Sequence, residues 1–535
     1  MVARQRQRSF WTWGFREDEP NEDVRQRAAK SASNRLGREV KPPVIPSIES
    51  IQLRDSRISI PSRLQSFVMD DQFDRVVHTH GGHVLELLQA IRGEFPYPPD
   101  AVAHPSSDQE LEELLEWCNR DRIKVVPYGG GTSVVWGVNP PADAERVVTV
   151  DTDRLNQILE VDEVSRAAKF QAGILGPDLE AELKPLDLTL RHYPQSFPWS
   201  TVGGWIATRS GGHYATNHTH IDDFVESTRM ITPSGWFESR RLPGSGAGPS
   251  PDRLVLGSEG TLGIITEAWL RLQVRPKYRA SASVFFDDWY QGTRAVRTLV
   301  QTKLFPANLR ILDPAEATLA AGVQTNQALL IIGFESADVP QNHQMNTMVE
   351  MVRDLGGQVN DEDVVISDGS GKATGRKGSV GQWRNSFIGV NAGAQLGLGL
   401  LSDTFETATT WDNWEHFDRQ VRTKVGDTLK RVLGNGSSLS CRFTHVYPDG
   451  PAPYYTFSGI VPIGHEVEAW QEIKNTANEV IIDNGGTITH HHAVGRLHKS
   501  AWEAQRPELF GSMLKGAKAS VDPQGLMNPG VLIGD

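Results

Sequence analysis

The sequence predicts an α+β protein with an N-terminal helical segment, a middle domain and a larger C-terminal domain. Its 535 residues exceed what one ordinary hydrophobic core organises, so two or three domains are expected. A proline-dense stretch, FPYPPDAVAHPSS (95–107), separates a polar first segment from the rest. Beyond it, short apolar strands alternate with helical stretches, and no internal repeat is present. We therefore place the domains at residues 1–95, 96–275 and 276–535.

The first helices are predicted by helical periodicity and by capping signals. In the N-terminal segment we expect helices over Glu22–Gly37 and Asp71–Ile91. In the middle domain, Ser107 and Glu110 have the spacing of a capping box. The residues that follow place an apolar stripe on one helix face, at i, i+3, i+4 and i+7: Leu111, Leu114, Leu115 and Cys118.

Strands are predicted where apolar residues run together or alternate with polar ones. IKVVP (123–127) is a short strand, and GIITEAWLRLQV (263–274) alternates in the way of a half-buried strand. In the C-terminal domain, ALLIIGF (328–334) is a strand, and helical stretches follow at 338–355 and 466–483. These elements fit the α+β class predicted for the chain.

Composition and charge exclude several classes of protein. The formal net charge of −12 disfavours nucleic-acid binding, which needs a basic face. Two cysteines cannot form a disulfide framework. The N-terminus lacks the apolar core of a secretory signal, so we expect a cytoplasmic protein. Arginines and aromatic residues in Arg4–Trp13 leave a peripheral membrane contact open, beside the alternative of an arm that packs on the body.

A glycine-rich loop follows the first strand of the middle domain. Three consecutive glycines in PYGGGTS (127–133) can turn successive backbone N–H groups inward and form a nest for a phosphate or pyrophosphate. The spacing is not that of a Rossmann fingerprint, and no Lys-Ser/Thr follows as in a P-loop. A simple glycine-rich turn is the other interpretation of this loop alone.

Two further loops of small residues support a shared cofactor. They are PQSFPWSTVGGWIATRSGG (194–212) and LVLGSEGTLGIITEA (254–268). Each is a weak signal by itself. Three such loops within about one domain's length are better explained by one extended ligand than by three unrelated turns.

Taken in order, these motifs resemble the FAD-binding domain of the vanillyl-alcohol oxidase/PCMH flavoprotein superfamily. Within it the chain is most similar to the alkyldihydroxyacetonephosphate synthase family, through STVGGWIATR, RILD, DTFET, CRFTHVY and HHHAVGRLHK. The likeness runs from WTWGF (11–15) to the C-terminus. It implies a PCMH-type FAD-binding domain, an α/β cap domain over the isoalloxazine ring, and a C-terminal segment that returns to the FAD domain.

The resemblance also implies which residues hold FAD, with non-covalent binding expected. The pyrophosphate is expected on the glycine loop: Pro127, Tyr128, Gly129, Gly130, Gly131, Thr132 and Ser133. Further contacts are expected from three groups: Gln195, Ser196, Phe197, Pro198, Trp199, Ser200 and Thr201; Thr208, Arg209, Ser210 and Gly211; and Glu259, Gly260, Thr261, Leu262, Gly263, Ile264 and Ile265.

Enzymes similar to this chain exchange the acyl group of acyl-dihydroxyacetonephosphate for a fatty alcohol, a step of ether-lipid synthesis without net redox change. Matching positions here are Tyr454 as proton acceptor and donor, the triplet His490, His491 and His492, and Arg310. For Tyr454 the alternative is a core tyrosine paired with Tyr455. The partner would be a small-molecule or lipid substrate; the superfamily often dimerises, so a homodimer stays open.

One departure from the family concerns the substrate. The family has a substrate-binding arginine upstream of the FET motif, where counting back from DTFET (403–407) gives Ala392. Loss of that arginine removes a charge-assisted partner for a phosphate dianion. Arg384 is the nearest candidate to replace it. The fold and the flavin do not depend on this position, but the substrate assignment does.

Three alternatives remain open from the sequence. The histidine clusters at 78/80/83, 213/218/220 and 490–492 could bind metal, but no HExxH, CxxC or carboxylate-spaced partner accompanies them, so we expect no metal. An FAD-linked oxidoreductase of the 2-hydroxy-acid dehydrogenase type is the second function, because DPQGLMNPG (522–530) resembles such enzymes. A flavin-binding protein without catalysis is the third.

Overall fold

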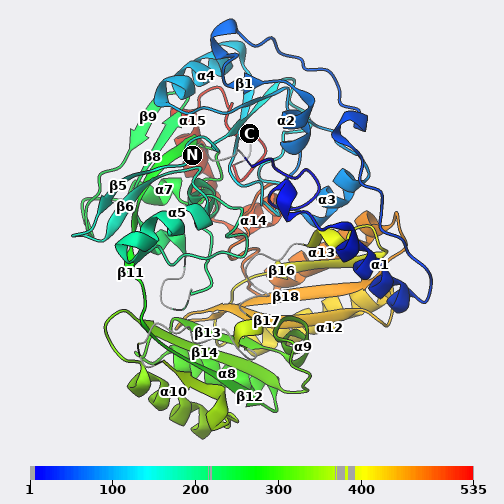
Figure 1. The fold of residues 1–535 in the computed structure, drawn as a ribbon, viewed down its shortest axis with the longest axis vertical. Helices are drawn as coiled ribbons and strands as arrows, with labels where there is room; N and C mark the ends of the chain where they lie inside the picture. The colour runs from blue at the N-terminus through cyan, green and yellow to red at the C-terminus, as the bar shows by residue number, and fades with distance from the viewer. Residues whose placement is uncertain are drawn as a thin grey trace.

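The computed structural model describes residues 6–214, 216, 220–367, 369, 380–383 and 392–533, and the elements below are those of this part of the chain. It has two bodies that meet along the middle of the molecule (Figure 1). The upper body is built around two sheets, and the lower body around one larger sheet. The helices of the upper body are α2 (Gln72–Val77), α3 (Val84–Ile91), α4 (Asp108–Asp121), α5 (Gly176–Leu183), α6 (Val202–Thr208) and α7 (Asp252–Val255).

The first sheet of the upper body has strand order β1-β2-β4-β3, with parallel pairing from β2 to β3. Its strands are β1 (Val68–Met69), β2 (Ala101–Ala103), β3 (Lys124–Tyr128) and β4 (Val147–Asp151). The second sheet is antiparallel, in the order β5-β6-β10-β8-β9. Its strands are β5 (Ile158–Asp162), β6 (Ala167–Gln171), β8 (Val225–Thr232), β9 (Gly235–Glu238) and β10 (Ile264–Arg271), and a small pair joins β7 (Leu188–Thr189) to β11 (Gln273–Val274).

The lower body is a seven-stranded antiparallel sheet in the order β15-β12-β14-β13-β17-β18-β16. Its strands are β12 (Tyr278–Phe286), β13 (Asn308–Leu312), β14 (Ala328–Ser336), β15 (Val364–Ile366), β16 (Leu400–Glu406), β17 (Ser438–Val446) and β18 (Pro451–Ile460). The helices around it are α8 (Trp289–Val300), α9 (Pro314–Ala321), α10 (Asn342–Asp354), α12 (Trp414–Leu433) and α13 (Glu466–Asp483).

The two faces of this sheet have different roles. Alternate residues of the strands pack with α8, α10, α12 and α13 in one large core, as Ile311, Phe443 and Tyr455 do. Residues of opposite parity, such as Leu312 and Leu329, pack with α9 in a smaller core on the other face. The polar side chains of the candidate site share this second parity, so the sheet turns them away from the large core.

The two ends of the chain both contribute to the upper body. Helices α14 (Lys499–Gln505) and α15 (Glu508–Val521), red in Figure 1, lie among its elements. The C-terminal segment then pairs with β3, where Val125 N–H donates to Leu526 O at 2.9 Å and Asn528 N–H donates to Val125 O at 2.8 Å. Near the N-terminus, Trp11 and Phe15 are buried, and Phe10 and Trp13 pack against the same core. The aromatic rings that a membrane contact would use therefore face inward.

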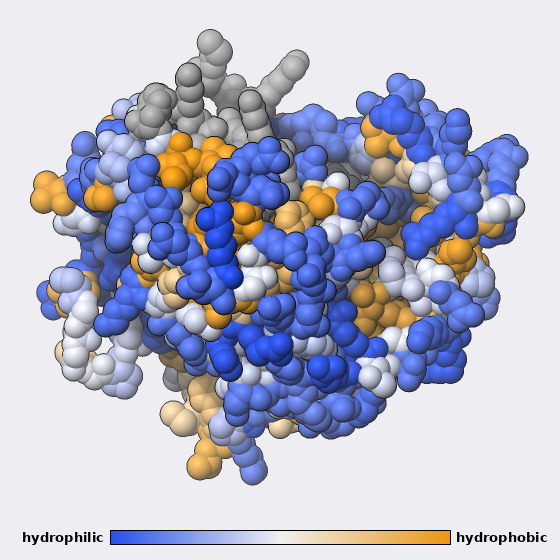
Figure 2. Space-filling model, turned by 90° about the horizontal axis from the view of Figure 1, so that it is seen from below, coloured by the Kyte–Doolittle hydropathy of each residue, from blue (hydrophilic) through white to orange (hydrophobic). Residues whose placement is uncertain are grey.

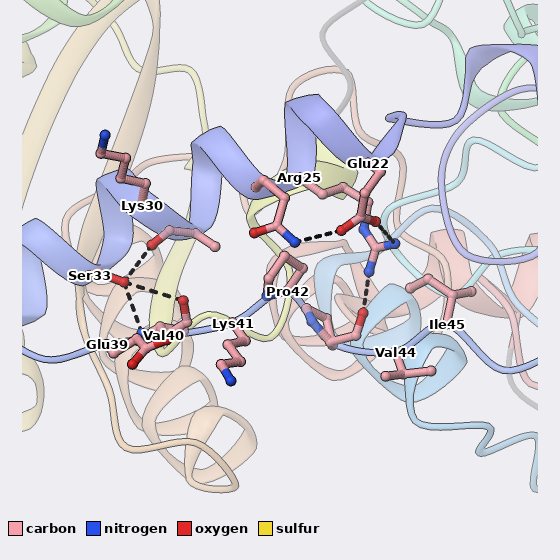
Figure 3. A pocket seen from close by; sticks show the side chains of 13 residues that line it. Glu22, Arg25, Lys30, Ser33, Glu39, Val40, Lys41, Pro42, Val44 and Ile45 are labelled. Atoms are coloured by element: carbon pink, nitrogen blue, oxygen red, sulfur yellow. Dashed lines mark hydrogen bonds and ion pairs between the residues drawn. The ribbon is translucent and has the colours of Figure 1, made fainter.

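Helix α1 (Glu22–Leu36) confirms the predicted helix, and its C-cap is Gly37, with φ +63°. It lies beside the lower body, and residues 39–45 run back along it. Figure 3 shows the shallow hollow between the two, where Ser33 Oγ accepts a hydrogen bond from Val40 N–H at 2.8 Å. This hollow contains none of the predicted site residues.

The predicted helix over 71–91 is wrong in one respect, because the structure has two helices there. The break contains Gly81 and Gly82, and Gly82 N–H donates to Ser133 O at 2.7 Å. A Cβ atom on Gly81 would lie 2.6 Å from the same oxygen. The helix therefore breaks where the chain must approach the glycine-rich loop closely.

None of the helices in the described part of the chain is both long and apolar enough to cross a bilayer. Seen from below, the surface is largely hydrophilic, and its hydrophobic residues form separate groups rather than one continuous apolar face (Figure 2).

Candidate active site

A cavity lies between the glycine-rich loop after β3, helix α6 and the start of β10. It encloses about 670 Å³ of space free of protein atoms, including space open to solvent. Its walls are formed by small and β-branched residues, with hydroxyl groups from Ser133, Thr152 and Thr208. The residues that line it are Pro127, Tyr128, Gly129, Ser133, Val135, Gly137, Val138, Thr152, Ala172, Gly203, Gly204, Ala207, Thr208, Glu259, Gly260, Gly263, Ile264, Ile265 and Ala493. Such a narrow cavity suits a flat, extended ligand.

The glycines are required by close packing behind this cavity. A Cβ atom on Gly129 would lie 2.4 Å from Thr201 Oγ1, and one on Gly130 would lie 2.0 Å from Trp199 O. The loop 195–201 therefore packs behind the glycine-rich loop instead of lining the cavity. Thr201 also caps α6, since its Oγ1 accepts from Gly204 N–H at 3.2 Å.

A buried carboxylate closes one end of the cavity. Glu259 accepts hydrogen bonds from the N–H groups of Val494, at 2.9 Å, and Gly495, at 2.7 Å. Burial raises the pKa of Glu259 to about 7. Ala493, which directly follows the histidine triplet, lines the same cavity with φ +74°. The cavity wall thus leads directly to the triplet.

The triplet occupies an irregular segment between α13 and α14. Its backbone is held by Glu406 at the end of β16. Glu406 accepts from the N–H groups of His490 at 2.8 Å, His491 at 3.2 Å and His492 at 3.1 Å. Burial raises the pKa of Glu406, but the nearby histidines, His491 above all, outweigh it and hold that pKa well below its usual range.

Strand register brings Tyr454 beside Glu406. Tyr454 of β18 pairs with Glu406 of β16 on one side and with Arg442 of β17 on the other. The Tyr454 hydroxyl donates to Thr404 Oγ1 at 3.0 Å, and the Arg442 guanidinium lies 4.1 Å from the Tyr454 ring centroid. Burial raises the pKa of Tyr454, so its hydroxyl is neutral. The ring centroids of His491 and His492 lie 5.9 and 5.5 Å from the ring centroid of Tyr454.

Arg310 completes a cationic wall. It is 1% exposed on β13, and its Nη2 donates to His213 O at 2.9 Å. Burial, followed by repulsion from Arg442, lowers the pKa of Arg310 to about 9, which leaves it charged at neutral pH. Arg310 and Arg442 both face the ring of Trp383, at 5.8 and 5.2 Å from its centroid. Arg442 is neutralised by an ion pair with the buried Glu316, so Arg310 is the guanidinium of this wall that suits an anionic ligand.

A further polar group joins the two bodies beside Tyr454. Lys474 of α13 is 4% exposed, and its Nζ donates to Thr404 O at 2.7 Å. Asp403 lies 3.8 Å from Lys474 Nζ and 3.8 Å from His83 Nε2. Burial lowers the pKa of Lys474, and it lowers the pKa of His83 to about 4. The buried amine of Lys474 therefore lies next to Thr404, whose Oγ1 accepts from the Tyr454 hydroxyl.

The comparisons with known proteins agree with this arrangement. A family model described as "FAD binding domain" matches residues 99–238, and one described as "FAD linked oxidases, C-terminal domain" matches residues 275–532. The two matches correspond to the upper body and to the larger part that follows it. The chain belongs to the PCMH-type FAD-binding flavoproteins. FAD is its cofactor.

The flavoprotein has relatives of two kinds. It is 26% identical to "Alkyldihydroxyacetonephosphate synthase" of Dictyostelium discoideum, over 93% of this chain and 85% of the relative. It is 25% identical to "Glycolate oxidase subunit GlcD" of Bacillus subtilis (strain 168), over 81% of this chain and 88% of the relative. A solved alkyldihydroxyacetonephosphate synthase matches with a TM-score of 0.74 and 24% identity, over 91% of this chain and 88% of that one. p-Cresol methylhydroxylase shares the fold, with a TM-score of 0.65 and 14% identity, over 96% and 98%.

The cavity fits FAD, and the predicted contact residues divide into two groups. Pro127, Tyr128, Gly129, Ser133 and Thr208 line the cavity, as do five residues of the third loop: Glu259, Gly260, Gly263, Ile264 and Ile265. The others lie behind or beside the lining. For example, Arg209 forms an ion pair with Asp222 at 2.9 Å, and Ser210 Oγ lies 2.9 Å from His192 Nε2. The cavity thus brings together ten of the predicted contact residues.

Sequence reasoning missed four residues of this site: Glu406, Arg442, His445 and Lys474. The first three lie inside the motifs DTFET and CRFTHVY. These motifs carry the resemblance, but they do not indicate a role for these three residues. Lys474 lies in a helix of ordinary amphipathic pattern, and no sequence signal marks it. Ala392 begins a short 3-10 turn ahead of β16, and Arg384 lies outside the described residues.

The first histidine cluster is explained by hydrogen bonds. His78 Nε2 lies 2.9 Å from Asp151 Oδ2, and His80 Nε2 lies 3.0 Å from Glu94 O. His83 Nδ1 accepts from Leu85 N–H at 3.2 Å at the start of α3. These rings face different partners, so they form no common site. His218, of the second cluster, lies outside the described residues.

Proposed function

We propose that this flavoprotein is an FAD-dependent enzyme of the alkyldihydroxyacetonephosphate synthase type. In the exchange, the carbon–oxygen bond to the acyl group of acyl-dihydroxyacetonephosphate breaks and a bond to the oxygen of a fatty alcohol forms. A fatty acid leaves, and no net oxidation occurs. The observation that carries the proposal is the row Arg442, Tyr454 and Glu406 across three adjacent strands, next to a histidine triplet that leads into the cofactor cavity.

Each group in this row has a task that fits the reaction. Bound FAD supplies a reactive ring system at which the substrate carbon is activated. Tyr454 accepts the substrate proton in its ionised form, which Arg442 favours, and returns it as the neutral hydroxyl, whose direction Thr404 Oγ1 fixes. Arg310 supplies positive charge for the phosphate, while the charge of Arg442 is balanced by Glu316. The triplet offers imidazoles for the carbonyl oxygen, in an orientation set by Glu406.

We also propose that FAD is held non-covalently. Covalent attachment requires a nucleophilic side chain in the cavity wall, and the lining of the described cavity contains neither cysteine nor histidine. The Tyr128 hydroxyl is directed to backbone oxygens of Val77 and His80, at 3.4 and 3.5 Å. Acid precipitation should therefore release all of the yellow cofactor into the supernatant, and cofactor left in the protein pellet would contradict this.

The decisive experiment incubates the purified yellow protein anaerobically with acyl-dihydroxyacetonephosphate and hexadecanol. The expected result is equal amounts of ether product and free fatty acid without an added electron acceptor. Tyr454→Phe should lower the rate by about 10³-fold, because it removes the proton acceptor, while FAD stays bound. Tyr97→Phe is the matched control, since Tyr97 is 51% exposed. An unchanged rate in Tyr454→Phe would remove Tyr454 from the mechanism.

A second candidate is an FAD-linked oxidoreductase that acts on 2-hydroxy acids. Ala392 at the position of the family's substrate arginine favours it, as does the GlcD relative. The absorption spectrum of the flavin distinguishes the two functions. Full bleaching of the flavin by glycolate or lactate, reversed by an electron acceptor, would establish the oxidoreductase and exclude the transferase.

A further inference from the structure

His445 is the least satisfied polar side chain of the site. It lies on β17, at a register shift between Phe443 and His445, and it is 2% exposed. Neither of its ring nitrogens has a hydrogen-bond partner among the described residues. A buried imidazole without partners is costly, because its donor and its acceptor have both left water. Another interaction at this position must therefore offset the free-energy cost of burying the imidazole.

Other imidazoles converge on His445. Its ring centroid lies 4.8 Å from that of His490 and 5.3 Å from that of His491. One ring nitrogen from each of the three lies within 4.8 Å of the others. His490 Nδ1 is 3.0 Å from His491 Nδ1, and Tyr447 Oη is 2.7 Å from His490 Nε2. The Nδ1 atom of His490 thus points into the group while its Nε2 is fixed from outside.

We propose that His445, His490 and His491 bind one divalent transition-metal ion of the zinc class. Imidazole nitrogen is the preferred ligand of such ions, at about 2.0–2.1 Å, which places ligand nitrogens roughly 3.3 Å apart in a tetrahedral site. The three nitrogens, which lie within 4.8 Å of one another, would reach that spacing by rotation of their side chains. Three histidines with one open position form the ligand set of catalytic zinc sites, and the open position would take a substrate oxygen.

The surroundings fit a cation. Glu406 Oε2 lies 3.3 Å from His491 Nδ1 and brings a buried negative charge next to the three rings. A fourth imidazole, His220, has its ring centroid 4.8 Å from that of His490, and its buried Nε2 also lacks a partner among the described residues. A network held by hydrogen bonds alone would satisfy His490 and His491 but would leave His445 and His220 without partners. A metal ion accounts for His445 directly.

Gly211 makes room for the group. A Cβ atom there would lie 2.5 Å from His445 Nε2, so a larger residue would push the ring out of place. The site goes beyond the proposed function: an ion bound there would take over from His490 and His491 the polarisation of the carbonyl oxygen. Metal binding can be measured without substrate, so its failure would leave the tests of the proposed function untouched.

The test titrates Zn²⁺ into the FAD-loaded protein after chelation and dialysis, in competition with a chromophoric chelator. We expect one tight site per chain. His445→Gln should weaken binding at least about 100-fold, because a direct ligand is lost. His416→Gln, at an exposed histidine of α12, should bind as the wild type does. Gly211→Ala should weaken binding although every histidine is retained.

Cobalt provides a readout that needs no variant. Co²⁺ in place of Zn²⁺ should give the intense visible bands of a four-coordinate, nitrogen-ligated ion, whereas the weak bands of a six-coordinate ion would overturn the proposal. Absence of a tight site in the wild-type protein, or equal binding by wild type and His445→Gln, would also overturn it. If His445→Gln loses FAD, His491→Ala takes its place and must show the same loss of Zn²⁺.

Discussion

At the scale of single residues, one carboxylate organises the histidine triplet. Glu406 is 3% exposed and accepts hydrogen bonds from three consecutive backbone N–H groups, and from Thr489 Oγ1 at 2.5 Å. A carboxylate suits this role, because it offers only acceptors to a set of donors. An amide at the same place would turn an N–H₂ group toward some of those donors.

Glu406→Gln should therefore lower kcat by roughly 100-fold and destabilise the fold by about 1–3 kcal/mol, because buried donors would lose their acceptor. The FAD content should not change, since Glu406 does not line the cofactor cavity. Steady-state rates, flavin absorbance and chemical unfolding measure the three quantities. Glu468→Gln, on the exposed side of α13, is the control. A Glu406→Gln enzyme with the wild-type kcat would show that the triplet does not need this anchor.

Individual residues of the site were predictable only where a motif named them. The triplet, Tyr454 and Arg310 came from the resemblance, and the structure places Tyr454 against the triplet and Arg310 against Trp383, which Arg442 also faces. Glu406 and His445 could not be predicted, because their roles depend on strand register and on a bulge between residues far apart in sequence. No single-sequence pattern encodes which strand lies beside which.

At the scale of elements, helices and strands could be predicted where the hydrophobic pattern of a short segment is sufficient by itself. The helix predicted at 466–483 is α13, the stripe after Ser107 is the buried face of α4, and ALLIIGF lies within β14. Local patterns do not predict the backbone of the triplet, which is irregular. Backbone donors there bond to a carboxylate in place of a neighbouring strand, and that choice depends on tertiary contacts.

The N-terminal arm shows how one element controls another. Arg8 donates to both carboxylate oxygens of Asp151 at 3.0 Å and to Gly129 O at 2.7 Å, so the arm fixes the glycine-rich loop from behind. Arg8→Ala should weaken FAD binding by about 10–100-fold, the size of a lost charge-assisted contact. Fluorescence titration of the apoprotein with FAD measures this. Arg6→Ala, which removes an exposed pair with Glu17 and a contact with the Phe15 ring, should bind normally. Equal affinity of the two variants would contradict the role of the arm.

At the scale of the whole molecule, the two chain ends converge on the cofactor cavity. The N-terminal arm contacts Gly129, and the C-terminal segment pairs with β3 and contacts Glu259. Length and composition predict more than one domain, but they do not predict these contacts, which join residues hundreds of positions apart. Cofactor binding and folding are linked in such an arrangement, because FAD stabilises only the state in which both ends are in place.

Asn528 tests that linkage. Its Nδ2 donates to Glu259 O at 2.7 Å and to Gly137 O at 2.9 Å, and so joins the C-terminal segment to two lining residues of the cavity. Asn528→Ala removes both buried bonds, at about 1 kcal/mol each, and should weaken FAD binding by roughly 10–30-fold. The rise in Tm on adding FAD should shrink accordingly at a fixed FAD concentration. Asn156→Ala loses a comparable bond at an exposed turn and should keep the full rise. If the Asn528→Ala protein shows the wild-type rise in Tm, packing of the C-terminal segment on the upper body is not linked to FAD binding.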